Sequence, residues 1–186
     1  MSGESQLLEK AKNGSLPAFE ELILLYEKKV YNYCYRMTNS REDAEDLTQE
    51  VFIKVYKNLG SFKGNSKFST WLYRIAHNIC IDKYRKQKAV LIPLFGQNED
   101  GEERPLVLKS DEPSLEEQVL AGERQALVQS CINSLKPDYS SVIILRDLQH
   151  HTYEEIADIL KVPLGTVKSH ISRARAALRQ ALDSVL

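Results

Sequence analysis

Cationic and aromatic side chains alternate between residues 62 and 88. Seven basic residues and a single acid, Asp82, occur from Lys63 to Lys88, and among them lie Phe62, Phe68, Trp71, Tyr73 and Tyr84. Cations neutralise phosphates and aromatic faces stack on unpaired bases, so this combination suits single-stranded nucleic acid. The alternative is that the rings form a core while the cations are solvated. The segment alone leaves both interpretations open.

A second basic face lies near the C-terminus. From Lys161 to Gln180 there are five basic residues and no acid. An apolar stripe predicts one helix here, formed by Val167, Ile171, Ala174, Leu178 and Leu182. At 100° per residue, the opposite face holds Lys168, Ser169, Ser172, Arg173 and Arg179. Such side chains reach base edges and phosphates in the DNA major groove, whereas a merely solvated basic face is the alternative.

A third candidate surface is acidic. Asp46, Gln49, Glu50 and Ile53 recur at the i, i+3, i+4 and i+7 positions of a predicted helix, beside its apolar stripe. Such a strip, acidic with an apolar residue at its end, can dock on a basic partner. A solvated acidic face explains the same residues.

Helical periodicity positions these side chains. Apolar stripes predict a long helix from Phe19 to Met37, a second from Ala44 to Leu59, and a third from Phe68 to Tyr84. Ser40 precedes the second helix and Gly60 ends it, and Gly14-Ser15 separates a short opening helix from the first. Residues 142–145 favour a strand by propensity, but their flanks keep helical spacing and predict a helix.

The C-terminal part resembles a helix-turn-helix. Capping-box patterns begin at Ser114 and at Thr152, the latter before a short helix that carries Ala157. The segment 161–165 makes a tight turn, after which Thr166 is expected to cap the last helix. Two helices joined by a short glycine-bearing turn are typical of this DNA-binding motif.

Charge divides the 186-residue chain, although its formal net charge is only −1. Residues 91–118 hold two basic and eight acidic side chains, and three of the six prolines. This segment shows no helical or alternating period, so residues 91–116 are predicted to be an acidic linker. The expected fold is all-α, with two small helical domains at residues 1–90 and 117–186.

Several classes of protein are disfavoured. The longest uncharged stretch, residues 125–135, is too short to cross a bilayer, and no signal peptide is visible. Cys34, Cys80 and Cys131 are too widely spaced for a disulfide framework or a zinc site. No phosphate loop, nucleophile motif or metal spacing supports an enzyme, and His150-His151 is interpreted as a polar turn. A cytoplasmic protein without cofactor, metal or small-molecule substrate is expected.

Three strings, in this order along the chain, resemble extracytoplasmic-function (ECF) sigma factors of the sigma-70 family. They are DAEDLTQEVF at residues 43–52, FSTWLYRIA at residues 68–76, and YEEIA at residues 153–157 with PLGTVKS at residues 163–169. Their order and separation match as well, so the resemblance covers nearly the whole chain outside the linker.

The resemblance implies three sets of functional residues. The residues implied to bind the β′ clamp of core RNA polymerase are Asp46, Gln49, Glu50, Ile53 and Lys54. The residues implied to open and read the promoter −10 element are Lys63, Lys67, Phe68, Trp71, Arg74, His77, Asn78 and Arg85. The residues implied to read the −35 element in duplex DNA are Thr166, Lys168, Ser169, Ser172, Arg173 and Arg175.

The resemblance also implies a contact with the β flap of polymerase and control by an anti-sigma factor, often one anchored in the membrane. The sequence departs from many relatives at His170 and Ser172, which leaves the −35 sequence open. Two rival classes are a freestanding repressor and a sigma mimic that binds polymerase without DNA. The first does not explain the aromatic-basic segment, and the second does not require Lys168 and Arg173.

Overall fold

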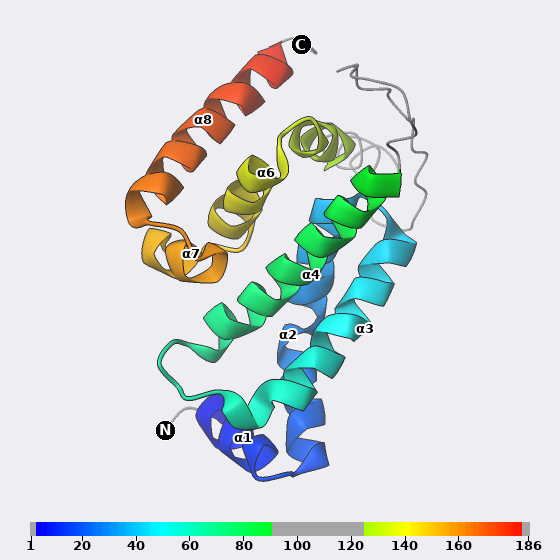
Figure 1. Ribbon diagram of the computed structural model, residues 1–186, viewed down its shortest axis with the longest axis vertical. Helices are drawn as coiled ribbons and strands as arrows, with labels where there is room; N and C mark the ends of the chain where they lie inside the picture. The colour runs from blue at the N-terminus through cyan, green and yellow to red at the C-terminus, as the bar shows by residue number, and fades with distance from the viewer. Residues whose placement is uncertain (1–2, 91–124, 184–186) are drawn as a thin grey trace, which may run out of the picture.

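The computed structural model describes residues 3–90 and 125–183, and in this part of the chain all regular structure is helical (Figure 1). The first half contains α1 (Gly3–Lys12), α2 (Leu16–Thr38), α3 (Arg41–Asn58), a 3-10 turn η1 (Leu59–Ser61) and α4 (Phe68–Val90). The second half contains helical residues 125–133, α6 (Pro137–Ile143), a π-helical turn η2 (Ile144–Leu148), α7 (Tyr153–Leu160) and α8 (Leu164–Asp183). The predicted all-α class is therefore confirmed for the described residues.

Local sequence explains the helix ends in the first half. The Ser15 side chain accepts a hydrogen bond from the Ala18 N–H, and proline stands in the first turn of α2, where a missing N–H costs nothing. Asn39 ends α2 in the left-handed conformation (φ 54°). Ser40 then caps α3 through the Asp43 N–H, as its place in the sequence predicts.

The first half is a bundle of α2, α3 and α4, with α1 packed against α2 at one end (Figure 1). Each helix contributes the stripe expected from periodicity, and the large side chains that are almost fully buried include Leu22, Val30, Tyr33, Val51, Val55 and Leu72. Burial of these apolar side chains is the main stabilising contribution to the bundle. It also fixes which faces of α3 and α4 point outward.

The second half is built around the helix-turn-helix. Thr152 and Glu155 form the complete capping box of α7, and Lys161 ends that helix in the left-handed conformation (φ 58°). The last helix begins at Leu164, so the expectation that Thr166 is its cap is wrong. The Thr166 N–H already donates to the Pro163 carbonyl (2.9 Å), which places Thr166 inside the first turn.

Residues 142–145 are helical, as their flanks predict, and they span the end of α6 and the start of η2. The predicted linker at residues 91–116 and the capping box at Ser114 lie outside the described residues. Within residues 3–90 and 125–183, no helix combines the length and apolarity needed to cross a membrane.

The two halves pack against each other. In Figure 1 α7 lies beside the N-terminal half of α4, and α6 lies between α8 and the first bundle. The Arg36 guanidinium donates to Gln129 Oε1 (2.8 Å), and the Gln129 amide donates back to the Arg36 carbonyl (3.1 Å). The second half therefore contacts both α2 and α4 of the first half.

Candidate nucleic-acid and partner interfaces

Five residues of α3 form an exposed surface that we call the docking strip: Asp46, Gln49, Glu50, Ile53 and Lys54. The core side of α3 is formed by buried residues such as Leu47 and Val51, so the strip lies off the core, as predicted. Ile53 is 55 % exposed although it is a large apolar residue. Asp46 and Glu50 make no ion pair and no side-chain hydrogen bond within the described part of the chain. The strip is thus available to a partner.

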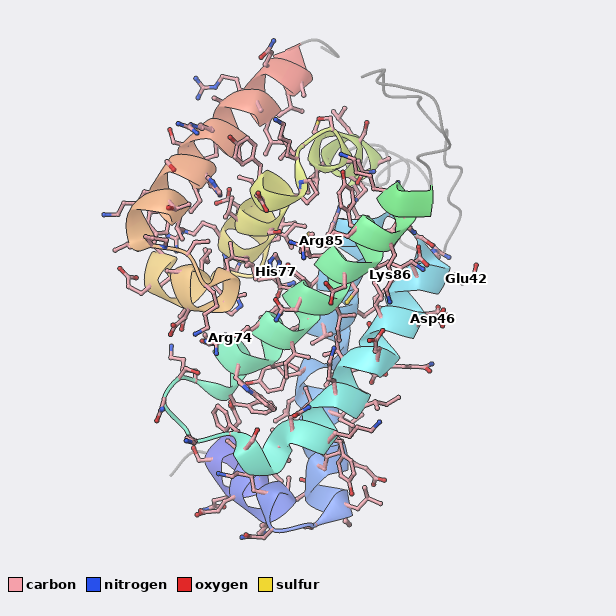
Figure 2. The ribbon with its side chains drawn as sticks, in the orientation of Figure 1. Glu42, Asp46, Arg74, His77, Arg85 and Lys86 are labelled. Atoms are coloured by element: carbon pink, nitrogen blue, oxygen red, sulfur yellow. The ribbon has the colours of Figure 1, made fainter. Side chains whose placement is uncertain are left out.

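Neighbouring acids of α3 have a different role. The Asp43 carboxylate pairs with Lys83 Nζ at 2.6 Å and accepts a hydrogen bond from Gln87 at 3.3 Å. The hydrogen bond with Asp43 raises the pKa of Lys83. Figure 2 shows Glu42 and Asp46 on the α3 side of the bundle, with Lys86 of α4 turned toward them. Asp43 therefore ties α3 to α4 and is not part of the docking strip.

The eight residues expected to contact the −10 element occupy two different environments. Lys63, Asn78 and Arg85 are exposed, and Figure 2 shows Arg74, His77 and Arg85 on the side of α4 that faces α6 and α7. Phe68 is only 4 % exposed, and its ring packs edge-on against Tyr26 and Phe62. We do not retain Phe68 as a base contact, because a buried ring presents no face to a base.

Trp71 lies at the edge of the same aromatic cluster. Its ring is half-buried and packs 5.2 Å from Phe62 and 5.9 Å from Phe68, measured between centroids. One part of the indole therefore belongs to the core and another part reaches solvent.

His77 is half-buried against α2. The Tyr33 hydroxyl and His77 Nδ1 share a hydrogen bond of 3.1 Å. Burial lowers the pKa of His77 to about 4, so the ring is neutral at physiological pH. In this conformation His77 is a neutral imidazole and contributes no positive charge to this side of α4.

Two cations, one just before α4 and one on α4, are paired with α7. Lys67 Nζ lies 2.8 Å from Glu155 Oε1, and Arg74 Nε donates to the Asp158 carbonyl at 3.0 Å. Arg74 Nη2 is also 3.9 Å from the Asp158 carboxylate. Sequence reasoning treated Glu155 only as part of a capping box and gave Asp158 no role.

The same interface contains buried aromatic groups that the sequence analysis did not place there. Tyr73 is 2 % exposed, donates a hydrogen bond to Gln149 Oε1 (2.7 Å) and packs its ring edge-on against His151. His150 and His151 lie in the connection between η2 and α7, as expected, but the side chain of His151 is only 7 % exposed and is therefore not solvated. His150 has a left-handed backbone (φ 59°), which is typical of a turn.

The exposed side of α8, which we call the recognition face, carries Lys168, Ser172, Arg173 and Arg175. A groove of about 420 Å³ along it is lined by polar side chains at helical spacing, Lys168, Ser172, Arg175 and Arg179, and by Tyr153 of α7. Arg179 belongs to the basic face predicted from helical spacing, although the resemblance did not include it among the −35 contacts. Thr166 and Ser169 are half-buried, and the Ser169 hydroxyl donates to the Thr166 carbonyl.

Two residues of α8 have partners on other helices. The Arg175 guanidinium donates two hydrogen bonds to Asp147 of η2, at 2.5 and 3.2 Å. His170 packs edge-on against Tyr139 of α6. The unusual histidine therefore stabilises the packing of α8, whereas the other departure, Ser172, lies in the groove.

Models of two sigma-70 regions match the chain in order. Sigma-70 region 2 matches residues 22–90, and Sigma-70 region 4 matches residues 125–178. The ECF RNA polymerase sigma factor SigW of Bacillus subtilis is 38 % identical over 176 residues, which are 94 % of each chain. The chain belongs to the ECF sigma factors. This family consists of transcription regulators and not of enzymes.

Other members are similar over the same length. The RNA polymerase sigma-H factor of Pseudomonas aeruginosa is 36 % identical, over 98 % of this chain and 95 % of its own. The ECF RNA polymerase sigma-E factor of Escherichia coli is 37 % identical, over 97 % of this chain and 94 % of its own.

Solved structures share the fold. The sigma factor RpoE of Bartonella quintana, solved in complex with the anti-sigma factor NepR, has a TM-score of 0.69 and 25 % identity. That match covers 89 % of this chain and 96 % of RpoE. CnrH, solved with the cytosolic domain of CnrY, has a TM-score of 0.73 and 23 % identity over 98 % of this chain and 99 % of its own.

Proposed function

We propose that this ECF sigma factor binds core RNA polymerase through the docking strip and directs initiation at promoters that it reads at two elements. The observation that carries this proposal is the ordered match of both halves to sigma-70 regions, with relatives that are 36–38 % identical along nearly the whole chain. The role of each surface follows from its chemistry. The docking strip presents carboxylates and an exposed isoleucine, which suit a basic and partly apolar partner.

Promoter reading is divided between the two halves. In our proposal α8 enters the major groove of the −35 element, where Lys168 and Arg173 contact base edges and phosphates. The −10 element is opened and held as single-stranded DNA by α4 and the loop before it, through Lys63, Lys67, Trp71, Arg74, Asn78 and Arg85. Residues 1–90 then act as region 2 and residues 117–186 as region 4, joined by the segment 91–116.

Control by an anti-sigma factor is part of the proposal. RpoE of Bartonella quintana was solved with such a partner and has a similar fold at 25 % identity. We propose that this protein acts in the cytoplasm, where core polymerase is found, and that its anti-sigma factor holds it at the inner face of the membrane.

The decisive experiment is transcription in vitro with purified bacterial core polymerase on genomic DNA fragments, followed by sequencing of the transcript 5′ ends. We expect start sites that share one −35 and −10 pair and that are absent with core polymerase alone. A Lys168→Ala/Arg173→Ala variant should lose these starts while it still binds polymerase.

Two outcomes would contradict the proposal. Sequence-specific duplex binding by the free protein without any new start sites would support a repressor. Polymerase binding without any new start sites would support a sigma mimic.

A further inference from the structure

None of the side chains of α1 has a role in the proposed function, although this helix packs near the segment assigned to −10 DNA. Helix α1 precedes residues 22–90, which the Sigma-70 region 2 model matches. Figure 1 shows α1 beside the end of α3, and it contacts the 3-10 turn η1. That turn leads into residues 63–67, which we call the −10 loop because the proposed function assigns Lys63 and Lys67 to the −10 element. One side of α1 therefore lies at the start of the −10 loop.

Lys12 of α1 contacts Phe62, the residue just before the −10 loop. Lys12 Nζ donates a hydrogen bond to the Phe62 carbonyl at 2.8 Å and lies 5.9 Å from the centroid of the Phe62 ring. Because the donor is a charged ammonium group, this hydrogen bond is stronger than one between neutral groups. The Phe62 N–H donates to the Leu59 carbonyl at 3.1 Å, and the ring is buried against Phe68 and Trp71. Phe62 is thus held at its N–H, its carbonyl and its ring.

The −10 loop itself has little support of its own. Residues 63–66 make no hydrogen bond and no ion pair within the described part of the chain. Gly64 has a left-handed backbone (φ 74°), so the chain turns sharply there. A segment with few bonds of its own is the least stable part of a fold, and its path depends on the fixed residues beside it. For the −10 loop these residues are Phe62 and Phe68.

The residue that follows the −10 loop also receives support from α1, through Tyr26 of α2. Burial and a hydrogen bond with Glu4 of α1 raise the pKa of Tyr26, so the phenol stays protonated and can donate to the Glu4 carboxylate. The Tyr26 ring packs edge-on against Phe68, with 5.5 Å between the centroids. Phe68 is the first residue of α4. Helix α1 therefore supports the residues on both sides of the −10 loop, Phe62 directly and Phe68 through a neighbour.

We infer that Lys12 is a positioning residue for −10 reading, which acts through the Phe62 carbonyl to set the path of the −10 loop. The inference rests on the proposed function and adds to it a residue that contacts no base. The rival role for an exposed lysine is a direct contact with a promoter phosphate. The two roles differ because only positioning changes the loop in the absence of DNA.

The test compares full-length variants with the wild type. Lys12→Met removes the ammonium group and keeps a long apolar side chain, whereas Lys12→Arg keeps a charged donor for the Phe62 carbonyl. The matched control is Lys10→Met. It removes the same charge from an exposed residue of the same helix, whose side chain makes no hydrogen bond or ion pair in the described chain. Thermal denaturation first establishes that every variant is folded at the temperature of the assays.

The first measurement uses the single tryptophan of the chain, Trp71, whose ring lies 5.2 Å from that of Phe62. We expect Lys12→Met to move its emission to longer wavelength and to increase its quenching by acrylamide. The reason is that loosening Phe62 exposes more of the half-buried indole. Lys12→Arg and Lys10→Met should retain the wild-type emission and quenching.

The second measurement is transcription with core polymerase from a promoter that the wild-type protein uses and from versions with one base pair exchanged. The activity ratio between the original promoter and a −10 exchange measures −10 discrimination, and a −35 exchange serves as the internal control. Lys12→Met should lower the −10 ratio about three- to tenfold, the effect of weakening one hydrogen bond, and leave the −35 ratio unchanged. Lys12→Arg should restore the −10 ratio.

Three results would overturn the inference. They are a −10 ratio for Lys12→Met equal to that of Lys10→Met, a lower melting temperature as the only effect, and an equal loss of activity on all promoters with unchanged Trp71 fluorescence. The last result would make Lys12 a phosphate contact.

The proposed function is judged separately, from the wild type and Lys10→Met. If both direct specific start sites, it stands whatever Lys12→Met does. If the wild type directs none, it fails together with the assignment of Lys12 to −10 reading, and the fluorescence then reports only whether Lys12 holds the loop.

Discussion

The acidic residues of α3 differ in their contacts and exposure, and this difference separates their roles. Asp43 is bonded to Lys83 and Gln87, whereas Asp46 and Glu50 extend into solvent from the same helix. Sequence spacing placed all three near one another. Only their tertiary contacts separate a residue that holds two helices together from residues that are available to a partner.

The first prediction concerns Asp46 and Glu50. Replacing either with alanine should change the free energy of unfolding by no more than about 0.5 kcal/mol, as for surface residues generally. Affinity for core polymerase should fall severalfold or more, measured by titration of labelled protein. Glu42→Ala, on the same helix but outside the docking strip, is the control. Lost thermal stability with unchanged polymerase affinity would assign these carboxylates to the fold.

The second prediction separates two arginines. Arg173→Ala removes an exposed cation of the recognition face and should weaken −35 recognition, where a good base contact is worth about 1–3 kcal/mol. The reactivity of the −10 region on a template with a pre-melted bubble should be nearly unaffected. Arg74→Ala should instead impair strand opening on duplex templates and be partly rescued by a −10 bubble.

Permanganate footprinting on duplex and bubble templates distinguishes these two variants. Equal defects of the Arg74 variant on both templates, with normal polymerase binding, would remove strand opening from α4. Because Arg74 also contacts Asp158, free-protein binding assays cannot replace this comparison.

The third prediction concerns His77 and pH. Burial lowers the pKa of His77 to about 4, below the value of about 6.5 expected when the chain is unfolded. Between these values the unfolded chain binds more protons, so the contribution of His77 to stability is present above pH 6.5 and decreases as pH falls toward 4. Urea denaturation at pH 7.5 and 5 should show a smaller loss of stability for His77→Gln than for the wild type. Equal losses would mean that His77 titrates alike in both states.

At the scale of elements, the loop before α4 and the start of α4 combine packing with the proposed contact to DNA. Phe62, Phe68 and Trp71 form one aromatic cluster that joins this segment to Tyr26 of α2. The exposed cations Lys63 and Lys67 flank the cluster. The aromatic core therefore positions the cations.

The fourth prediction tests this division of roles. Phe68→Ala should destabilise the protein by about 3–5 kcal/mol, as for large buried aromatic residues, whereas Lys63→Ala should change stability by less than about 0.5 kcal/mol. Thermal denaturation measures the first effect, and strand opening with polymerase measures the loss caused by Lys63→Ala. A Phe68 variant of normal stability that fails to open promoters would restore this ring as a base contact.

For the whole molecule, the net charge and the packing of the two halves are both expected to oppose DNA binding by the free protein. The chain carries a net charge of −1, residues 91–118 are acidic, and α7 engages Lys67, just before α4, and Arg74 of α4. Weak overall charge gives little counterion release on DNA binding, so neither half alone is expected to hold a promoter firmly.

The fifth prediction is that the isolated protein binds duplex promoter DNA weakly and that core polymerase restores specific binding. Polymerase would hold both DNA-reading halves near their elements and so raise their effective concentration. Electrophoretic mobility shifts at physiological salt, with and without core polymerase, measure the difference. Nanomolar sequence-specific binding by the free protein would favour a repressor.

Sequence by itself determined the helices, their buried faces and the family. Periodic stripes such as Val167, Ile171 and Ala174 encode which side of a helix is buried, because that choice depends on neighbours within a few residues. Capping at Ser15, Ser40 and Thr152 is equally local. The acidic and basic faces followed from the same periodicity.

Only the tertiary structure decided which partner each face meets. Phe68 and Trp71 look alike in sequence, yet one is buried and the other is half-exposed. The partners of Lys67 and Arg74 are more than eighty residues away, and Asp147 lies 28 residues before Arg175. No local pattern encodes such pairs, since they form only when separate helices pack together. For that reason the covering of α4 by α7 could not be predicted from the sequence.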